Sequence, residues 1–498
     1  MSGPNSLPCD PCKELSDLEN TMARLVKRQS ELKRNINRTH SLLICRIPPE
    51  IIAKISGFTT TDPAISLPSA LILLTSICSD WRQIVAGTPE LWSSIKIDLP
   101  FVSESQTHDM VYGKVLRLAT LIDEWLARSG RLPLHISLGI SSRCDASEIA
   151  DVNTPEKYHP IFMILNRYSA RWRSLNISIP PTLFSCLQPD CLSLLEKLHV
   201  NVEFQEDQTG LHKYMLTFPP SPHLKAVGIA KTSMTFDVAL SLPNQWDNVT
   251  HVSAAWLTVP ESLKLLRLIP QLVHCEFHNI VGSISVNGDL GPPIIGPLSY
   301  LYLSWSQLRS QRSLCRFFDN LILPSLETLV LSHVTLMDPI TAFLERSACS
   351  LHTLSLEGLE IRPFNGLIRL LKFLSPSLKH LTVTDGFNSH DTNQQYLSIL
   401  SKTYSSQSMT TRNDDDDFLP NLEVFEYNST FFPSNSTTAI SLPNLTTQNH
   451  PKLSTFIPLR SVSINLGAIS EPIPQDILSC LQHLNEDGIM VTLRCVEL

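Results

Sequence analysis

The amino-acid sequence predicts an α/β repeat fold. An apolar-x-x-apolar-x-apolar pattern recurs along residues 172–464, and the first anchors of nine successive copies lie 23 to 29 residues apart. The stretches between copies, such as residues 262–269 and 340–346, carry apolar residues at helical spacing. One strand followed by one helix cannot bury its own apolar side, so neighbouring units are expected to stack against each other.

Composition and charge narrow the class of protein. The chain has 498 residues, of which 43% are hydrophobic and 17% charged, which excludes disorder as the overall state. A net charge of −8 gives no reason to expect nucleic acid or a membrane surface as a partner. No apolar run reaches the roughly 18 residues that cross a bilayer, and the N-terminus does not read as a secretory signal. With twelve scattered cysteines, we expect a cytoplasmic or nuclear protein.

The first predicted element is a helix over residues 13–40, after a tail, residues 1–12, that we expect to be disordered. Its seam alternates spacings of three and four, and consists of Leu15, Leu18, Met22, Leu25, Gln29, Leu32, Ile36 and Thr39. Such a seam fits either a coiled coil that joins two copies through residues 15–39 or a helix that packs on its own chain. The seam is short and contains a polar Gln, which favours the second interpretation.

Residues 44–97 form a second predicted unit, built from short helices. Pro48 and Pro49 cannot lie inside a helix but can open one, so we expect a helix to begin near Pro49. A second helix follows, with apolar residues in register at positions 71, 74, 78, 81 and 85. The unit closes with Thr88-Pro89-Glu90-Leu91-Trp92.

Three anchors of this unit resemble the F-box motif. They are Pro48-Pro49-Glu50-Ile51, then Ile77-Cys78-Ser79-Asp80-Trp81-Arg82, then Pro89-Glu90-Leu91-Trp92. The chain is also similar to a large fungal group of F-box-like proteins. This similarity lies in the heptad helix and in residues 122–130, 133–134 and 171–175. Two features depart from the pattern: Ser56 replaces a commonly aromatic or aliphatic residue, and residues 57–68 are longer and more polar than the usual turn. Either departure can weaken adaptor binding without altering the fold.

The resemblance implies a three-helix domain that docks on the Skp adaptor, and through it on the cullin, of a ubiquitin ligase. It assigns adaptor binding to apolar residues of the first two helices, namely Ile47, Pro48, Pro49, Ile51, Ile52, Ile55, Leu71 and Leu74. Trp81 and Trp92 would instead hold the domain together.

After a linker with a helix, residues 98–130, the recurring pattern marks residues 131–498 as leucine-rich repeats. The full prediction is an N-terminal helix and a three-helix F-box followed by an irregular leucine-rich-repeat solenoid, with parallel strands inside and helices outside. Irregularity is expected because residues such as Ile280 and Val334 replace the Asn or Cys that usually follows the first anchor by eight positions. Exposed insertions are expected at about 387–418 and 429–452. The first contains Asp414-Asp415-Asp416-Asp417, which fits a solvated loop better than a site for a basic partner.

Strand alternation places the residues between the anchors on the open face of the sheet, where Tyr, His and Glu suit a protein-binding surface. The candidate substrate-binding residues are His251, His274, Glu276, His278, Tyr300, Tyr302, Glu357 and His380. A metal ion held by His274 and His278 is not expected, because residues four apart on a strand lie roughly 13 Å apart. Cys9 and Cys12 have zinc-type spacing but lack a second pair, so no metal is predicted.

No phosphate-binding, nucleophile-elbow or metalloprotease motif occurs in the sequence, so neither catalysis nor a cofactor is expected. The favoured interpretation is a substrate-recognition subunit of a Skp-cullin-F-box ubiquitin ligase. Its repeats would hold a protein substrate while a separate enzyme transfers ubiquitin. The alternative is a leucine-rich-repeat scaffold or inhibitor that never meets the ligase. The sequence identifies neither the substrate nor a need for phosphorylation.

Overall fold

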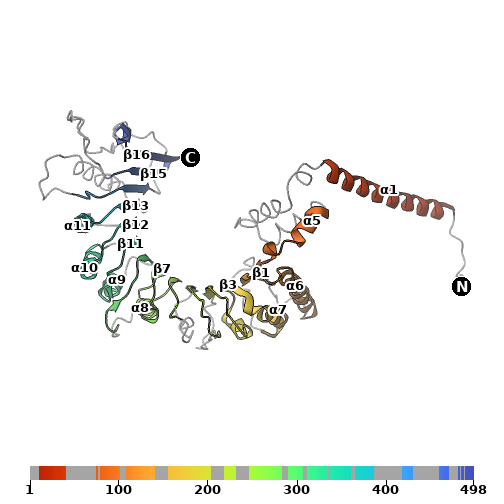
Figure 1. The fold of residues 1–498 in the computed structure, drawn as a ribbon, viewed down its shortest axis with the longest axis horizontal. Coiled ribbons are helices and arrows are strands. Elements are labelled where there is room, and N and C mark those ends of the chain that lie inside the picture. Colours follow the sequence, from red (N-terminus) through yellow and green to blue (C-terminus); the bar gives the residue numbers. More distant parts are fainter. Residues whose placement is uncertain are drawn as a thin grey trace. The chain divides into compact units, whose positions relative to one another are not determined.

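Figure 1 shows the computed structural model of the chain. The structure describes residues 10–40, 75–76, 79–100, 108–140, 155–202, 218–231, 246–282, 290–306, 311–334, 336–359, 365–385, 418–429, 459–469, 481–482, 484–486 and 488–497. The chain divides into two compact units, one formed by Met1–Asn176 and Cys186–Leu194, the other by Ile177–Ser185 and Leu195–Leu498. None of the described helices is both long and apolar enough to cross a membrane.

Fourteen strands form a large parallel sheet, and their order in the sheet is their order in the chain. The first three are β1 (Ser94–Leu99), β2 (Leu134–Ile140) and β3 (Trp172–Ser178). The second unit continues with β4 (Lys197–Val202), β5 (Ala226–Lys231), β6 (His251–Ala255), β7 (His274–Ile280), β9 (Tyr300–Trp305), β11 (Thr328–Ser332), β12 (Thr353–Leu359), β13 (His380–Asp385), β14 (Val424–Ser429), β15 (Ser461–Ile469) and β16 (Met490–Glu497). Two short strands, β8 (Ile294–Ile295) and β10 (Leu321–Ile322), pair separately. The predicted α/β class with parallel strands is therefore confirmed.

The apolar anchors of the recurring pattern lie opposite each other in neighbouring strands. The second anchors pair in register along the sheet, in the order Leu301, Leu329, Leu354, Leu381, Phe425 and Val462. All six side chains are fully buried. Because side chains alternate along a strand, one face of each strand carries these anchors and the other carries the residues between them.

Helices of the second unit cover the face with the anchors. They are α8 (Val259–Leu268), α9 (Gln311–Asp319), α10 (Asp338–Ser347) and α11 (Asn365–Leu374), and they overlap the stretches for which the sequence predicts helices. Phe317 of α9 meets the ring of Phe277 in β7 edge-on at 6.2 Å and that of Trp305 in β9 at 6.1 Å. Its neighbour Phe318 packs 5.0 Å from Phe343 of α10. These contacts bury the aromatic side chains between helices and sheet.

Four copies of the pattern end in the same backbone turn. The residue seven positions after the first anchor has a positive φ angle in each of them: Trp256, Asn279, His333 and Gly358. The next position, where regular repeats carry Asn or Cys, is filled in two of these copies by Ile280 and Val334, each buried to 1% exposure. In these copies apolar side chains thus occupy the position at which regular repeats bury an Asn or Cys, as the sequence predicts.

The first unit contains α1 (Asp10–His40), α5 (Ser79–Ala86), the 3-10 helix η1 (Pro89–Trp92), α6 (His108–Arg128), α7 (Pro155–Arg167) and the 3-10 helix η3 (Ser169–Arg171). A further 3-10 helix, η4 (Pro181–Cys186), follows β3. Helix α1 spans the segment with the heptad pattern. Its apolar seam residues from Leu15 to Ile36 are each 47–65% exposed. Whether the seam packs on its own chain or pairs with a second copy stays a prediction.

Trp92, the last residue of η1, packs against α6. Its side chain is buried against Val85 and Leu91, and its indole N–H donates a hydrogen bond of 2.8 Å to the Val85 carbonyl. The ring of Trp125 in α6 meets it edge-on at 4.7 Å. Trp81 is also buried. Both tryptophans therefore have the structural surroundings that a role in holding the segment together requires.

Several predictions concern residues outside the described part of the chain. They include the adaptor-binding set, namely Ile47, Pro48, Pro49, Ile51, Ile52, Ile55, Leu71 and Leu74. The insertions lie largely outside it as well, with the acidic run at residues 414–417, and so do Ser56, residues 57–68 and Cys9. These predictions remain predictions.

Candidate interaction surface

The candidate site is formed by side chains that alternate with the buried anchors on β6 to β13, a surface that we call the polar face. All eight predicted substrate-binding residues lie on it: His251, His274, Glu276, His278, Tyr300, Tyr302, Glu357 and His380. His251 and His380 are exposed and the other six are half-buried. The alternation of the sequence pattern is sufficient to place them there.

Three rings stack across three neighbouring strands. His251, His274 and Tyr300 are direct partners in the registers of β6, β7 and β9. The rings of His251 and His274 lie 5.4 Å apart at an angle of 27°, and those of His274 and Tyr300 lie 3.9 Å apart at 7°. Parallel strands run about 4.8 Å apart, so aligned planar side chains meet at stacking distance. This row presents flat, partly apolar surfaces with polar edges.

Glu276 links two histidines of its own strand. One carboxylate oxygen, Oε1, lies 3.0 Å from Nε2 of His274, and the other, Oε2, lies 3.4 Å from Nε2 of His278. Burial raises the pKa of this carboxyl, but the hydrogen bonds from the two imidazoles outweigh burial and hold the pKa of Glu276 below its ordinary value. The carboxylate therefore stays charged and fixes both rings.

The two tyrosines complete the cluster. The ring of Tyr302 lies 4.7 Å from that of His278. Burial, followed by the charges of Glu276 and Glu357, raises the pKa of Tyr300. Burial and Glu357 likewise raise the pKa of Tyr302, against the opposing hydrogen bonds of Ser332 and Ser304. Both phenols are therefore neutral at physiological pH and able to donate hydrogen bonds.

The structure does not gather all eight residues into one cluster. Six of them, from His251 to Tyr302, are in contact, and Glu357 acts on the tyrosines through its charge. His380 stands apart, because Thr328 and Thr353 lie between it and Tyr300 in the strand registers. The cluster is thus centred on β7 and β9.

Gly228 of β5, which pairs with Ser253 beside the polar face, is missing from the sequence-based set of candidates. The ring of His199 in β4 lies over Gly228 in β5, where a β-carbon would come within 2.8 Å of Cγ of His199. Burial lowers the pKa of His199. A lone glycine inside a strand often marks such a close approach, so the signal was present in the sequence at Gly228.

The side chains of the cluster are imidazoles, phenols and one carboxylate. The nearest thiol, Cys275, is fully buried on the opposite side of β7, where burial and then Glu276 raise its pKa well above the ordinary value. Within the described ranges, no three His, Cys, Asp or Glu side chains are arranged to hold a metal ion. Stacked rings with hydrogen-bonding edges and one carboxylate are instead typical of protein-interaction surfaces.

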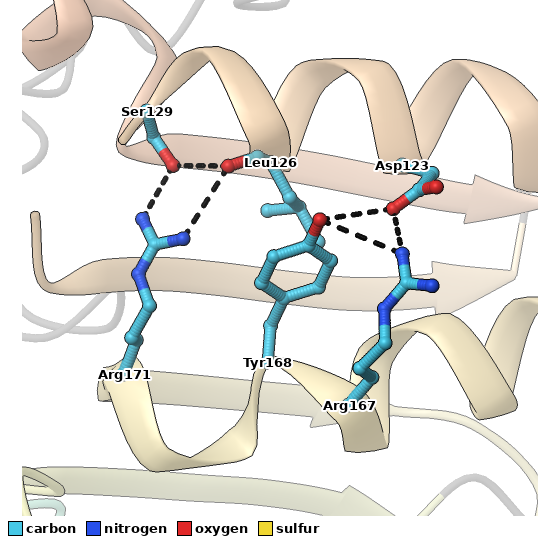
Figure 2. A network of polar contacts seen from close by, with 6 residues as sticks. All are labelled: Asp123, Leu126, Ser129, Arg167, Tyr168 and Arg171. Carbon is cyan, nitrogen blue, oxygen red and sulfur yellow. Dashed lines mark hydrogen bonds and ion pairs between the residues drawn. The ribbon is translucent and has the colours of Figure 1, made fainter. Parts of the chain in front are cut away.

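A second polar network lies in the first unit, between α6 and the segment that joins α7 to β3 (Figure 2). Arg171 donates from Nη2 to Oγ of Ser129 at 2.5 Å, and from Nε and Nη2 to the Leu132 carbonyl at 3.0 and 2.8 Å. Ser129 is fully buried and half-buried Arg171 has its pKa lowered, mainly by burial. This guanidinium therefore closes the C-terminal end of α6.

The other half of the network is centred on Asp123. Its carboxylate accepts hydrogen bonds from Arg167 and, at 3.0 Å, from the hydroxyl of Tyr168. The hydrogen bond from Arg167, supported by that of Tyr168, lowers the pKa of Asp123 although burial opposes the shift. Asp123 and Ser129 belong to residues 122–130, and Arg171 begins residues 171–175. The network thus joins these two segments, in a structural role.

Neither a protein-family model nor a curated protein matches this chain.

Proposed function

We propose that this chain is the substrate-recognition subunit of a Skp-cullin-F-box type of ubiquitin ligase. In this proposal the F-box-like segment binds the Skp adaptor, and the polar face binds a protein substrate. The observation that carries the second half is the cluster of six contacting His, Glu and Tyr side chains on β6, β7 and β9, which are held in place yet accessible. The first half rests on the sequence motifs of residues 48–92.

The repeat architecture is part of the proposal. Parallel strands in chain order, buried anchors in register and covering helices support a leucine-rich-repeat solenoid with strands inside and helices outside. A solenoid of this kind presents one continuous row of strand residues to a partner. The row through His251, His274 and Tyr300 continues with Thr328, Thr353 and His380, which together make a surface for an extended protein segment.

The chain would contribute proximity rather than chemistry. A bound adaptor and a bound substrate would be held on one molecule, and a separate enzyme of the ligase would transfer ubiquitin. No residue of this chain needs to be a nucleophile, which agrees with the neutral, buried thiol of Cys275. Such a role is compatible with a protein of the cytoplasm or the nucleus.

A second candidate function is a repeat scaffold or inhibitor that binds a protein without the ligase. Ser56 and the long connection at residues 57–68, which depart from the F-box pattern, favour this candidate. The two candidates share the polar face and differ only in adaptor binding. An adaptor-binding measurement therefore separates them.

The adaptor test uses the full chain and a purified Skp adaptor. Wild type is expected to bind the adaptor with micromolar or tighter affinity. The double variant, Ile51→Asp with Ile55→Asp, is expected not to bind, because two charges would replace apolar residues of the first predicted helix. Lys54→Asp is the matched control, since it changes the net charge by the same amount. Isothermal titration calorimetry gives the three affinities. No binding by folded wild type would reject the ligase and leave the scaffold.

The polar face is tested in the adaptor-bound complex. Tyr300→Ala removes the best-stacked ring of the cluster. For those lysate proteins that the wild-type complex captures, the variant is expected to lower the captured amount by about tenfold or more. Lys264→Ala, on the exposed side of α8, is the control and should leave capture unchanged. Quantitative mass spectrometry compares the two variants. Equal capture by Tyr300→Ala and wild type would remove the cluster from the binding surface.

A further inference from the structure

Helix α1 carries an apolar seam that its own unit leaves open. Leu15, Met22, Gln29 and Ile36 occupy the first core position of successive heptads, and Leu18, Leu25, Leu32 and Thr39 occupy the second. The six large apolar side chains among them are 47–65% exposed, and Val26, beside the seam, is 58% exposed. An apolar stripe along a helix of 31 residues, interrupted in its middle only by Gln29, is the kind of surface that associates in water.

The charges of α1 are divided between its two halves. In residues 10–25 the acidic residues outnumber the basic ones, and they are Asp10, Glu14, Asp17 and Glu19. In residues 26–40 the basic residues prevail, and they are Lys27, Arg28, Lys33, Arg34 and Arg38, with Glu31 the one acidic residue. The helix is thus acidic in its first half and basic in its second, which determines how a second copy can lie against it.

We propose that α1 pairs with α1 of a second copy of the chain as an antiparallel two-stranded coiled coil. Full overlap of the seams places Leu15 opposite Thr39 of the partner, Leu18 opposite Ile36, Met22 opposite Leu32 and Leu25 opposite Gln29. The acidic half of each helix then lies along the basic half of the other. The two helix dipoles also oppose each other, which stabilises an antiparallel pair.

Residues that flank the seam select this orientation. Glu19 and Lys33 occupy the same flanking position of the heptad, and the antiparallel arrangement brings them together from the two copies. A parallel, in-register pair would instead place Glu14 near Glu19 of the partner and Arg28 near Lys33 of the partner. Both of these pairs are repulsive, so the charges disfavour the parallel arrangement.

The oligomeric state of the full chain tests the pairing. Analytical ultracentrifugation is expected to show a dimer at micromolar concentrations, and Leu18→Asp with Leu25→Asp is expected to give monomers. Ala23→Asp with Ser30→Asp is the matched control, because it adds the same charges seven residues apart on the other side of the helix. A wild type that is monomeric up to about 100 μM, or a dimer that survives in the seam variant, would overturn the proposal.

Charge reversal tests the orientation. Glu14→Lys with Glu19→Lys is expected to weaken the antiparallel dimer about tenfold or more, because basic residues then lie along basic residues. Adding Arg28→Glu and Lys33→Glu to the same chain should restore the wild-type dissociation constant to within about threefold. A parallel dimer would respond differently, since Glu14→Lys with Glu19→Lys only exchanges one repulsive pair for another. An unchanged dissociation constant in that variant would therefore reject the antiparallel arrangement.

Discussion

At the scale of single residues, a histidine packed over a glycine connects packing with pH. The ring of His199 lies over Gly228, and the partial loss of water around the imidazole lowers its pKa below the ordinary value of 6.5. The folded protein thus binds a proton at His199 less readily than the unfolded chain does. Its contribution to stability is present above about pH 6.5 and is lost as the pH falls through the lowered native pKa.

This histidine makes the stability of the second unit depend on pH. We expect wild type to lose more stability than His199→Gln when the pH is lowered from 7.5 to 5.5, because the variant has no imidazole to protonate. Urea unfolding followed by tryptophan fluorescence at both pH values measures the difference. His223→Gln, which changes a histidine in the turn before β5 rather than on a strand, is the control. An equal loss in wild type and His199→Gln would show that another group titrates.

The residues of the polar face could be predicted from the sequence, but their contacts could not. Strand alternation alone assigns His274, Glu276 and His278 to one face. The stacking of His251 on His274, and the position of Glu276 between two imidazoles, depend on strand registers and on side-chain rotamers. Strand registers and rotamers depend on how neighbouring copies of the pattern pack. The spacing of the anchors alone does not specify which residue of one strand pairs with which residue of the next.

At the scale of elements, the end of α6 depends on one guanidinium from a distant part of the chain. Arg171 follows α7, yet it donates hydrogen bonds to the carbonyl of Leu132 just after α6. It also donates to the hydroxyl of Ser129, as Figure 2 shows. A planar fork with several N–H donors can serve these acceptors together, whereas an ammonium group cannot reproduce that geometry. The contact is therefore specific to arginine.

Arg171→Lys is expected to lower the stability of the first unit by about 1–3 kcal/mol, because buried acceptors lose their donors. Thermal unfolding followed by circular dichroism compares it with wild type. Arg131→Lys, at an exposed position close to the same turn, should change stability by less than about 0.5 kcal/mol. If both variants unfolded alike, the hydrogen bonds of Arg171 would contribute nothing specific.

Helices and strands were the most predictable elements. The 3–4 spacing at residues 340–346 and 367–374 is sufficient to predict α10 and α11, since each buries a continuous apolar stripe. The network around Asp123 and Arg171 was not predictable. Its members are separated by more than forty residues, and no local pattern links them. The exposed seam of α1 likewise could not be distinguished from a packed one by spacing alone.

At the scale of the whole molecule, each strand of the second unit contacts the strands of the adjacent copies. Leu354 in β12, for example, lies between Leu329 in β11 and Leu381 in β13. In a repeat array, stability is approximately a sum of local terms, because each copy contacts mainly its neighbours. A destabilising substitution in one copy should therefore lower the local stability of that copy and its neighbours only.

Leu354→Ala tests this locality. Removing a fully buried leucine is expected to cost about 2–5 kcal/mol, because it leaves a cavity between β11, β12 and β13. Hydrogen exchange with mass spectrometry should show lost protection in those three strands and wild-type protection in β5 and β6. Uniform loss across the second unit would contradict local stability and indicate a single cooperative core.

The order of the strands also bears on how the protein is made. Every strand from β5 onward in the main sheet pairs on one side with a strand that precedes it in the chain. A ribosome adds a 26-residue copy in roughly one to five seconds, whereas a local helix forms in about a microsecond or less. Each copy can therefore dock on a finished neighbour before the next one emerges. From β5 onward, each strand of the main sheet can pair with a strand that has already been synthesised. The unpaired apolar edge of the growing sheet is therefore short during synthesis.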